Sequence, residues 1–132
     1  MMAGYEKLQE AIRLIREERE RQILVEGFTP HLDKVRGHED LVMAAATYEM
    51  EPEYRKEHPD SWPWDYAWWK PSEHTAKGRI KELTKAGALY MAAKQVMELK
   101  DINIPLKQAV CQKIDLLAEM IAELLEKEVA NV

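Results

Sequence analysis

The chain has 132 residues, a net charge of −5, only five glycines and a single cysteine. This length suits one ordinary domain with its own core, and one cysteine excludes both an intramolecular disulfide and a cysteine metal cluster. The acidic balance argues against a general nucleic-acid binder, and the lack of a long apolar run or a signal-peptide pattern predicts a cytoplasmic protein without membrane contact.

The first helix is predicted over residues 5–25, because apolar residues recur there at three- and four-residue spacing. They are Leu8, Ala11, Ile12 and Ile15. The same face then becomes polar, with Glu18, Arg19, Gln22 and Glu26. The favoured interpretation is that this end of the helix emerges into solvent. The alternative is an inward polar network, which partners or a ligand would have to satisfy.

A short second helix is predicted over residues 39–49, after a stop at Gly27 and Pro30. Its apolar stripe comprises Leu41, Ala44, Ala45 and Tyr48. Pro52 ends it and begins an irregular connection over residues 52–71, which contains all four tryptophans. Connections of this length inside a compact domain are uncommon and often functional.

The third helix is predicted over residues 75–100, with Ser72 as its N-cap. Its apolar face is so broad that we expect the helix to be central and covered on more than one side. That face comprises Ile80, Leu83, Gly87, Tyr90, Met91 and Met97, flanked by Lys85, Ala88, Leu89, Ala92, Val96 and Leu99. Gly87 is expected to let another backbone approach closely.

The last helix is predicted over residues 105–129, with Pro105 in its first turn. Its apolar seam comprises Val110, Ile114, Leu117, Ile121 and Leu124. Such a seam can complete a four-helix bundle or pair with a second copy of the chain. We therefore predict an all-α single domain over residues 1–132. It is a four-helix bundle-like fold with a long Trp/Pro-rich loop between helices two and three, and it forms a homodimer through the C-terminal helix.

Five ordered motifs are similar to the patterns E-R-x-R-Q, E-G-aromatic, E-L-A-x-A-A-x-x-Y, W-P-W…W-K-P and L-V-K-A-G-A-L. The third motif has Asp40 and Val42 in place of its Glu and first Ala, and the last has Thr84 in place of Val. They lie at residues 18–22, 26–28, 40–48, 62–71 and 83–89. In this order they resemble a family of small, mostly uncharacterised bacteriophage and prophage proteins. The resemblance covers about residues 12–99, within a family-like core of about 5–100, and the C-terminal helix is an addition. Where the family tends to have D-D-x-H, this chain has Asp33-Lys34-Val35-Arg36, so any metal site of its relatives is expected to be lost.

Tryptophan rings stack on nucleobases, and arginine pairs with phosphate. These residue types predict a ligand-binding site made of Arg19, Arg21, Gln22, Trp62, Trp64, Trp69, Lys70 and Lys85. Together with the resemblance, they suggest a phage-encoded anti-defence protein that sequesters a nucleotide-like signal in the host cytoplasm, without a cofactor or bound metal. The competing interpretation is that the tryptophans cap the hydrophobic core and that Lys70 is a surface residue.

The runner-up hypothesis is a Mg²⁺-dependent nucleotide pyrophosphohydrolase of the MazG type, because carboxylates one helical turn apart suit Mg²⁺. Glu17 and Glu20 have this spacing, with Glu39, Asp40, Glu49 and Glu82 as candidate further ligands. A solvated acidic face is the favoured interpretation of the same pattern. A third hypothesis is a module that binds a host protein, since Trp, Tyr and Arg dominate interface hot spots.

Two further residue types carry little functional signal. The four histidines show no metal-ligand spacing and are expected in surface loops. They are His31, His38, His58 and His74. Cys111 lies among apolar neighbours and is expected to be a small core residue.

Overall fold

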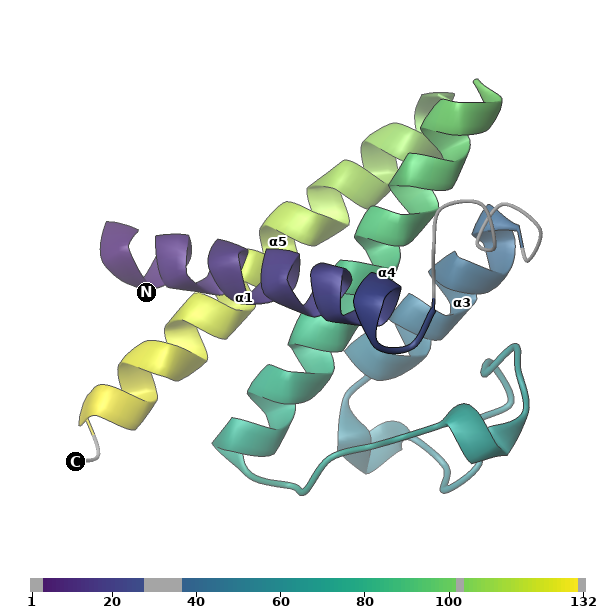
Figure 1. The fold of residues 1–132 in the computed structure, drawn as a ribbon. Coiled ribbons are helices and arrows are strands. Elements are labelled where there is room, and N and C mark those ends of the chain that lie inside the picture. Colours follow the sequence, from purple (N-terminus) through teal and green to yellow (C-terminus); the bar gives the residue numbers. More distant parts are fainter. Residues whose placement is uncertain (1–3, 28–36, 102–103, 131–132) are drawn as a thin grey trace.

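The computed structural model describes residues 4–27, 37–101 and 104–130, and all regular structure within them is helical (Figure 1). The helices are α1 (Tyr5–Leu24), α3 (His38–Glu49), α4 (Ala76–Lys100) and α5 (Ile104–Ala130), with short 3-10 turns η1 (Pro52–Tyr54) and η2 (Tyr66–Trp68). Each long helix begins and ends within one residue of its predicted bounds, so the all-α, bundle-like fold is confirmed. None of the described helices combines the length and apolarity that a membrane crossing needs.

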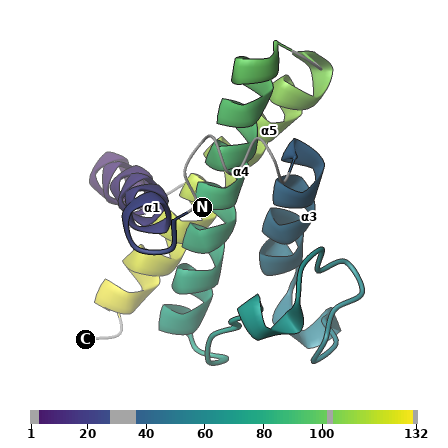
Figure 2. The same cartoon turned by 45° about the vertical axis from the view of Figure 1, so that its right-hand side comes forward.

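α4 is the central helix, as its broad apolar face predicts. It packs against α3, α5 and α1 (Figure 2). α5 runs beside it, whereas α1 lies across both helices (Figure 1). Small buried residues such as Ala86, Ala92 and Ala93 let these neighbours come close. Leu99 was wrongly assigned to the buried face: it is 59% exposed, because it lies in the last turn of α4, which projects beyond α1 and α3.

Gly87 accommodates a side chain rather than the expected backbone. A Cβ atom at Gly87 would lie 2.9 Å from Cδ1 and Cγ1 of Ile15, so this isoleucine of α1 fills the space above the glycine. The crossing of α1 over α4 therefore depends on a contact between one small and one branched residue.

The polar end of α1 turns inward, so the interpretation as a solvent-exposed end was wrong for two residues. Arg19 and Gln22 are each only 3% exposed. The Arg19 guanidinium donates to the Gln95 Oε1 of α4 from Nε at 3.1 Å and from Nη2 at 2.8 Å. The physical reason is that α1 stays against α4 beyond Ile15, so positions four and seven residues further on still face the core.

The start of α4 is capped by Thr75, not by Ser72. The Thr75 hydroxyl accepts a hydrogen bond from the Gly78 N–H at 3.0 Å, as an N-cap does. The prediction for Ser72 was wrong because α4 begins at Ala76, so Thr75 occupies the cap position. The Ser72 N–H donates to Glu82 Oε2 at 3.0 Å. A Cβ at Gly78 would collide with the Glu73 carbonyl oxygen, so this glycine permits the close turn that precedes α4.

A buried ion-pair cluster holds the connection against α3 and α4. Glu82 is 1% exposed and accepts from Arg55 Nη2 at 2.7 Å and from Arg79 Nη1 at 3.2 Å. Arg79 also donates to the carbonyl oxygens of Tyr48 and Glu49 at the end of α3. The last carbonyls of a helix lack intrahelical partners and carry partial negative charge, so two arginines there stabilise the helix end.

α5 places its predicted seam in the core of the same chain. Val110, Leu117 and Ile121 are buried, while Cys111 is half-buried rather than fully in the core. The start of α1 is tied to the end of α5, because the Gly4 N–H donates to Glu126 Oε1 at 2.6 Å. The homodimer through this helix stays a prediction.

Candidate functional site

The connection folds two of its tryptophans into the core. Trp62 and Trp69 are each 7% exposed, and their ring centroids lie 5.1 Å apart. Trp69 also packs on Tyr48, at 4.7 Å. Their indole N–H groups are satisfied by backbone, from Trp62 to the Asp65 carbonyl at 3.1 Å and from Trp69 to the Glu57 carbonyl at 3.2 Å. For these two rings the core-capping interpretation describes the packing.

The other two tryptophans lie nearer the surface. Trp64 is half-buried and stands edge-on to Trp62 at 5.4 Å between centroids. Trp68 is 59% exposed. The Asp65 carboxylate accepts from the Ala67 N–H at 2.8 Å and so caps η2, the turn that ends in Trp68. Fixing this short turn positions an aromatic side chain that packing alone does not bury.

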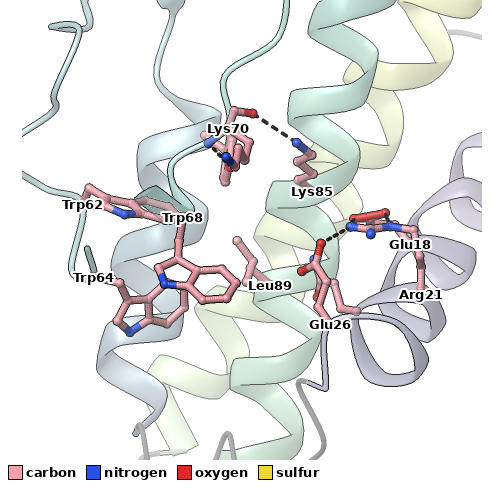
Figure 3. Close-up of a pocket in the computed structure, with 11 residues that line it drawn as sticks. Glu18, Arg21, Glu26, Trp62, Trp64, Trp68, Lys70, Lys85 and Leu89 are labelled. Atoms are coloured by element: carbon pink, nitrogen blue, oxygen red, sulfur yellow. Dashed lines mark hydrogen bonds and ion pairs between the residues drawn. The ribbon is translucent and has the colours of Figure 1, made fainter. Parts of the chain in front are cut away.

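These side chains form one wall of a cavity of about 170 Å³ (Figure 3). The aromatic wall consists of Tyr48, Trp62, Trp64 and Trp68. The opposite wall, called the α1 wall, consists of Glu18, Arg21 and Gln22 of α1 and of Glu26, just beyond its end. Leu89 of α4 lies between the walls, and Lys70 and Lys85 lie at one end (Figure 3). An engineered protein cavity of about 150 Å³ holds a benzene molecule, so this one has room for one small ring system.

Arg21 is engaged within the α1 wall. Its Nε donates to Glu18 Oε1 and its Nη2 to Glu26 Oε1, each at 2.6 Å. The hydrogen bond to Glu18, followed by that to Glu26, raises the pKa of Arg21 above its usual range. The guanidinium is therefore a bridge between two carboxylates, and the wall carries two negative charges against one positive charge.

Lys85 lies at the edge of the aromatic wall. Its Nζ donates to the Lys70 carbonyl at 3.1 Å and lies 5.4 Å from the centroid of the Tyr48 ring. Burial lowers the pKa of Lys85. Burial also raises the pKa of Tyr48 to about 12, and its hydroxyl accepts from the Lys70 N–H at 3.1 Å. Tyr48 is thus neutral near physiological pH and fixes the backbone from which the Lys70 side chain extends.

Most residues of the predicted site meet at this cavity. Those that line it are Arg21, Gln22, Trp62, Trp64, Lys70 and Lys85. Arg19 does not line it, because its guanidinium points to Gln95, and Trp69 packs beneath the aromatic wall. The predicted site residues did not include Glu18, Glu26, Tyr48, Trp68 and Leu89, which also line the cavity. Glu18 and Glu26 were considered only as part of a possible inward polar network, and Trp68 only as one ring of the tryptophan segment. Each belonged to a recognised stripe or to the tryptophan segment, but periodicity does not show which stripes meet.

The carboxylates considered for Mg²⁺ lie apart or are engaged elsewhere. Glu17 is exposed and pairs with Arg13 at 2.9 Å. Glu49 accepts from the Tyr90 hydroxyl at 2.8 Å and pairs with Lys113 at 2.7 Å. Within the part of the chain that the structure describes, no three His, Cys, Asp or Glu side chains gather as metal ligands would.

The histidines divide into three cases. His58 and His74 are exposed, as predicted. His38 is buried, so its predicted surface position was wrong, because it begins α3 instead of lying in a loop. His31 lies outside the described residues, as does the segment 33–36, where the chain departs from the D-D-x-H pattern.

Comparisons of the chain with family models, curated proteins and solved structures find no match. The resemblance to phage proteins therefore stays a prediction. The chemistry of the cavity is what bears on function, namely an aromatic wall, an α1 wall rich in acceptors, and two lysines at one end.

Proposed function

We propose that the protein binds a small nucleotide-like ligand in this cavity. Its base stacks on Trp64 and Trp68, and its anionic group contacts Lys70 and Lys85. The observation that supports this best is a ring-sized cavity that has an aromatic wall on one side and two lysines at one end. Stacking of a base on an aromatic side chain contributes about 1–3 kcal/mol, and it would cover Trp68, which is otherwise 59% exposed.

The lysines distinguish this ligand class from its main competitor, a small organic cation. Aromatic walls also attract quaternary ammonium groups, and the α1 wall holds carboxylates. A lone cation would however meet Lys70 and Lys85 in the same cavity. A ligand that combines a flat ring with an anion satisfies both the rings and the lysines.

We further propose that the ligand is held rather than turned over. Both carboxylates of the cavity, Glu18 and Glu26, are engaged by Arg21. A binder of this kind suits the phage origin that the family resemblance suggests, where sequestering a nucleotide signal would protect an infecting phage from a host defence system. The alternative is binding to a host protein, in which the same exposed Trp68 would be an interface residue.

The test is a titration with nucleotides and cyclic nucleotides, followed by tryptophan fluorescence with and without Mg²⁺, with chromatography of the recovered ligand. We expect saturable binding and intact ligand. Trp68→Ala should weaken binding about tenfold or more, because it removes one stacking surface. Tyr54→Ala is the matched control, since Tyr54 is 78% exposed and does not line the cavity.

Three results would change the proposal. Hydrolysed ligand in the presence of Mg²⁺ would favour the pyrophosphohydrolase. Equal weakening by Trp68→Ala and Tyr54→Ala would remove the cavity as the binding site. No response to any nucleotide would leave host-protein binding as the leading hypothesis.

A further inference from the structure

Gln22 is a cavity-lining residue whose side-chain acceptor is unsatisfied. Its side chain is buried, and no group that the structure describes donates a hydrogen bond to its Oε1. Gln22 lines the cavity from the α1 wall. A buried carbonyl without a hydrogen bond is destabilising, so native proteins rarely keep one without a reason. A donor on a bound ligand would supply the missing bond.

The groups around Gln22 favour a donor over an acceptor on the ligand. Glu18 and Glu26 lie in the same wall and carry only acceptor oxygens when ionised. Arg21, the strongest donor there, directs its Nε and Nη2 at these carboxylates. The α1 wall therefore offers oxygen acceptors, while the cations Lys70 and Lys85 lie at one end of the cavity (Figure 3).

We propose that the ligand's base carries an exocyclic amino group that donates a hydrogen bond to Gln22 Oε1. This rests on the nucleotide-binding function proposed above and makes the ligand an amino-bearing nucleotide. The amine lies at the acceptor-rich α1 wall, the ring lies against the tryptophans, and the phosphate lies at the lysines. An amide oxygen accepting from a base amine is a common way for proteins to recognise such bases.

The test compares pairs of nucleoside monophosphates whose two members differ only in the presence of this amino group. AMP is paired with purine riboside monophosphate, GMP with inosine monophosphate, and CMP with the monophosphate of the 4-deamino pyrimidinone riboside. Affinities are measured by calorimetry and tryptophan fluorescence. In any pair that binds, the amino-bearing member should bind at least about tenfold more tightly, because the deamino analogue leaves the buried carbonyl unpaired.

Gln22→Met tests the assignment to this residue, because methionine has a similar shape without the carbonyl. In this variant the two members of a pair should bind equally, at about the affinity of the deamino nucleotide for the wild type. Thermal unfolding checks that the variant folds, and the wild-type pairs test the proposal even if it does not.

The outcomes separate this inference from the proposed function. Binding without an amine preference would overturn the inference and leave nucleotide binding in place. A preference for the deamino members would also overturn it, because the wall would then be donating rather than accepting. No binding of any of the nucleotides would overturn both proposals.

Discussion

Lys85 combines a charge with partial burial, and this makes the proposed site sensitive to pH. Burial lowers the pKa of Lys85 from its usual value of 10.5, the nearby Glu18, Glu26 and Glu82 act to raise it, and Arg21 lowers it further. An anionic ligand is attracted only by the protonated amine. Nucleotide affinity should therefore fall as the pH rises through the lowered pKa, before the usual titration range of lysine is reached.

Calorimetry from neutral pH to about pH 10 would measure this fall, given that an unperturbed lysine titrates near 10.4. Lys85→Arg is the matched variant: arginine stays charged throughout this range, so its affinity should stay level where that of the wild type declines. Lys85→Met should bind weakly at every pH. If Lys85→Met showed the same decline as the wild type, another group would be responsible.

The contribution of Lys85 to the stability of the fold should change with pH in the direction opposite to its contribution to ligand affinity. The unfolded chain keeps its lysine proton up to about pH 10.4, whereas folded Lys85 releases it earlier. Between the two pKa values the unfolded state binds more protons, so the contribution of Lys85 to stability rises with pH. Tyr48 has the opposite effect above its usual pKa of 10.0, because its pKa is raised on folding. The difference between the wild type and Lys85→Met isolates Lys85.

The irregular connection between α3 and α4 is anchored near both of its ends by Glu82. Arg55 near its beginning and Ser72 near its end both donate to Glu82 Oε2. Glu82→Gln would leave the buried arginines Arg55 and Arg79 without their carboxylate. Breaking a buried pair in this way costs about 3–5 kcal/mol, so we expect a loss of that size.

Urea unfolding followed by tryptophan fluorescence measures the effect of Glu82→Gln, because the fluorescent side chains lie in the connection that Glu82 anchors. Glu73→Gln is the control: Glu73 is an exposed carboxylate of the same connection, and its removal should change stability by no more than about 0.5 kcal/mol. A loss of under about 1 kcal/mol in Glu82→Gln would mean that hydrophobic packing, not the ion-pair cluster, holds the connection.

The contact between Gly87 and Ile15, where α1 crosses α4, leads to a prediction about stability. Gly87→Ala should destabilise the protein by about 1–3 kcal/mol, because the new methyl group would overlap the side chain of Ile15. Ile15→Ala should also destabilise it, by leaving a cavity. The double variant should lose less than the sum of the two, since each change relieves the other. Strict additivity in thermal or urea unfolding would show that the two residues do not share this space.

At the scale of the whole molecule, sequence patterns predict the helices well and the tertiary contacts between them poorly. The stripe from Leu41 to Tyr48 is buried as predicted, because three- and four-residue spacing reports directly on which face of a helix is apolar. The same spacing placed Gln22 on the inward stripe of α1. Residue spacing does not show whether a position on that stripe is buried, because burial depends on how far α4 extends beneath the stripe.

The remaining differences concern the exact start of a helix and the local partner of a side chain, which residue type alone does not decide. Ser72 is a good N-cap residue by type, yet α4 begins at Ala76 and Thr75 occupies the cap position. Arg21 is a good phosphate ligand by type and lines the cavity as predicted for the site, but its guanidinium is engaged by Glu18 and Glu26. Residue type fixes what a side chain can bind, and the tertiary arrangement decides which partner it meets.

The cavity joins the end of α1, the connection and the middle of α4, so a ligand held there should stabilise the whole fold. A ligand that binds only the folded state contributes about 2.7 kcal/mol at one hundred times its Kd. For a domain of this size that corresponds to a rise in Tm of about 10 °C. Thermal unfolding with and without a nucleotide that binds would measure it, and Trp68→Ala should reduce the rise at the same ligand concentration.

Hydrogen exchange locates the effect within the molecule. Added protection should be largest at the end of α1 and around Trp68, because both segments line the cavity and would contact the ligand directly. A second hollow between α1, α4 and α5 is lined by two cations, Arg16 and Lys94, and by two carboxylates, Glu98 and Asp115, and it is the alternative location for a ligand. Protection centred there, with Trp68→Ala leaving the rise in Tm unchanged, would assign the ligand to that hollow. Protection at Trp68 that is lost in Lys85→Met would assign it to the tryptophan-lined cavity, because that cavity is lined by both residues.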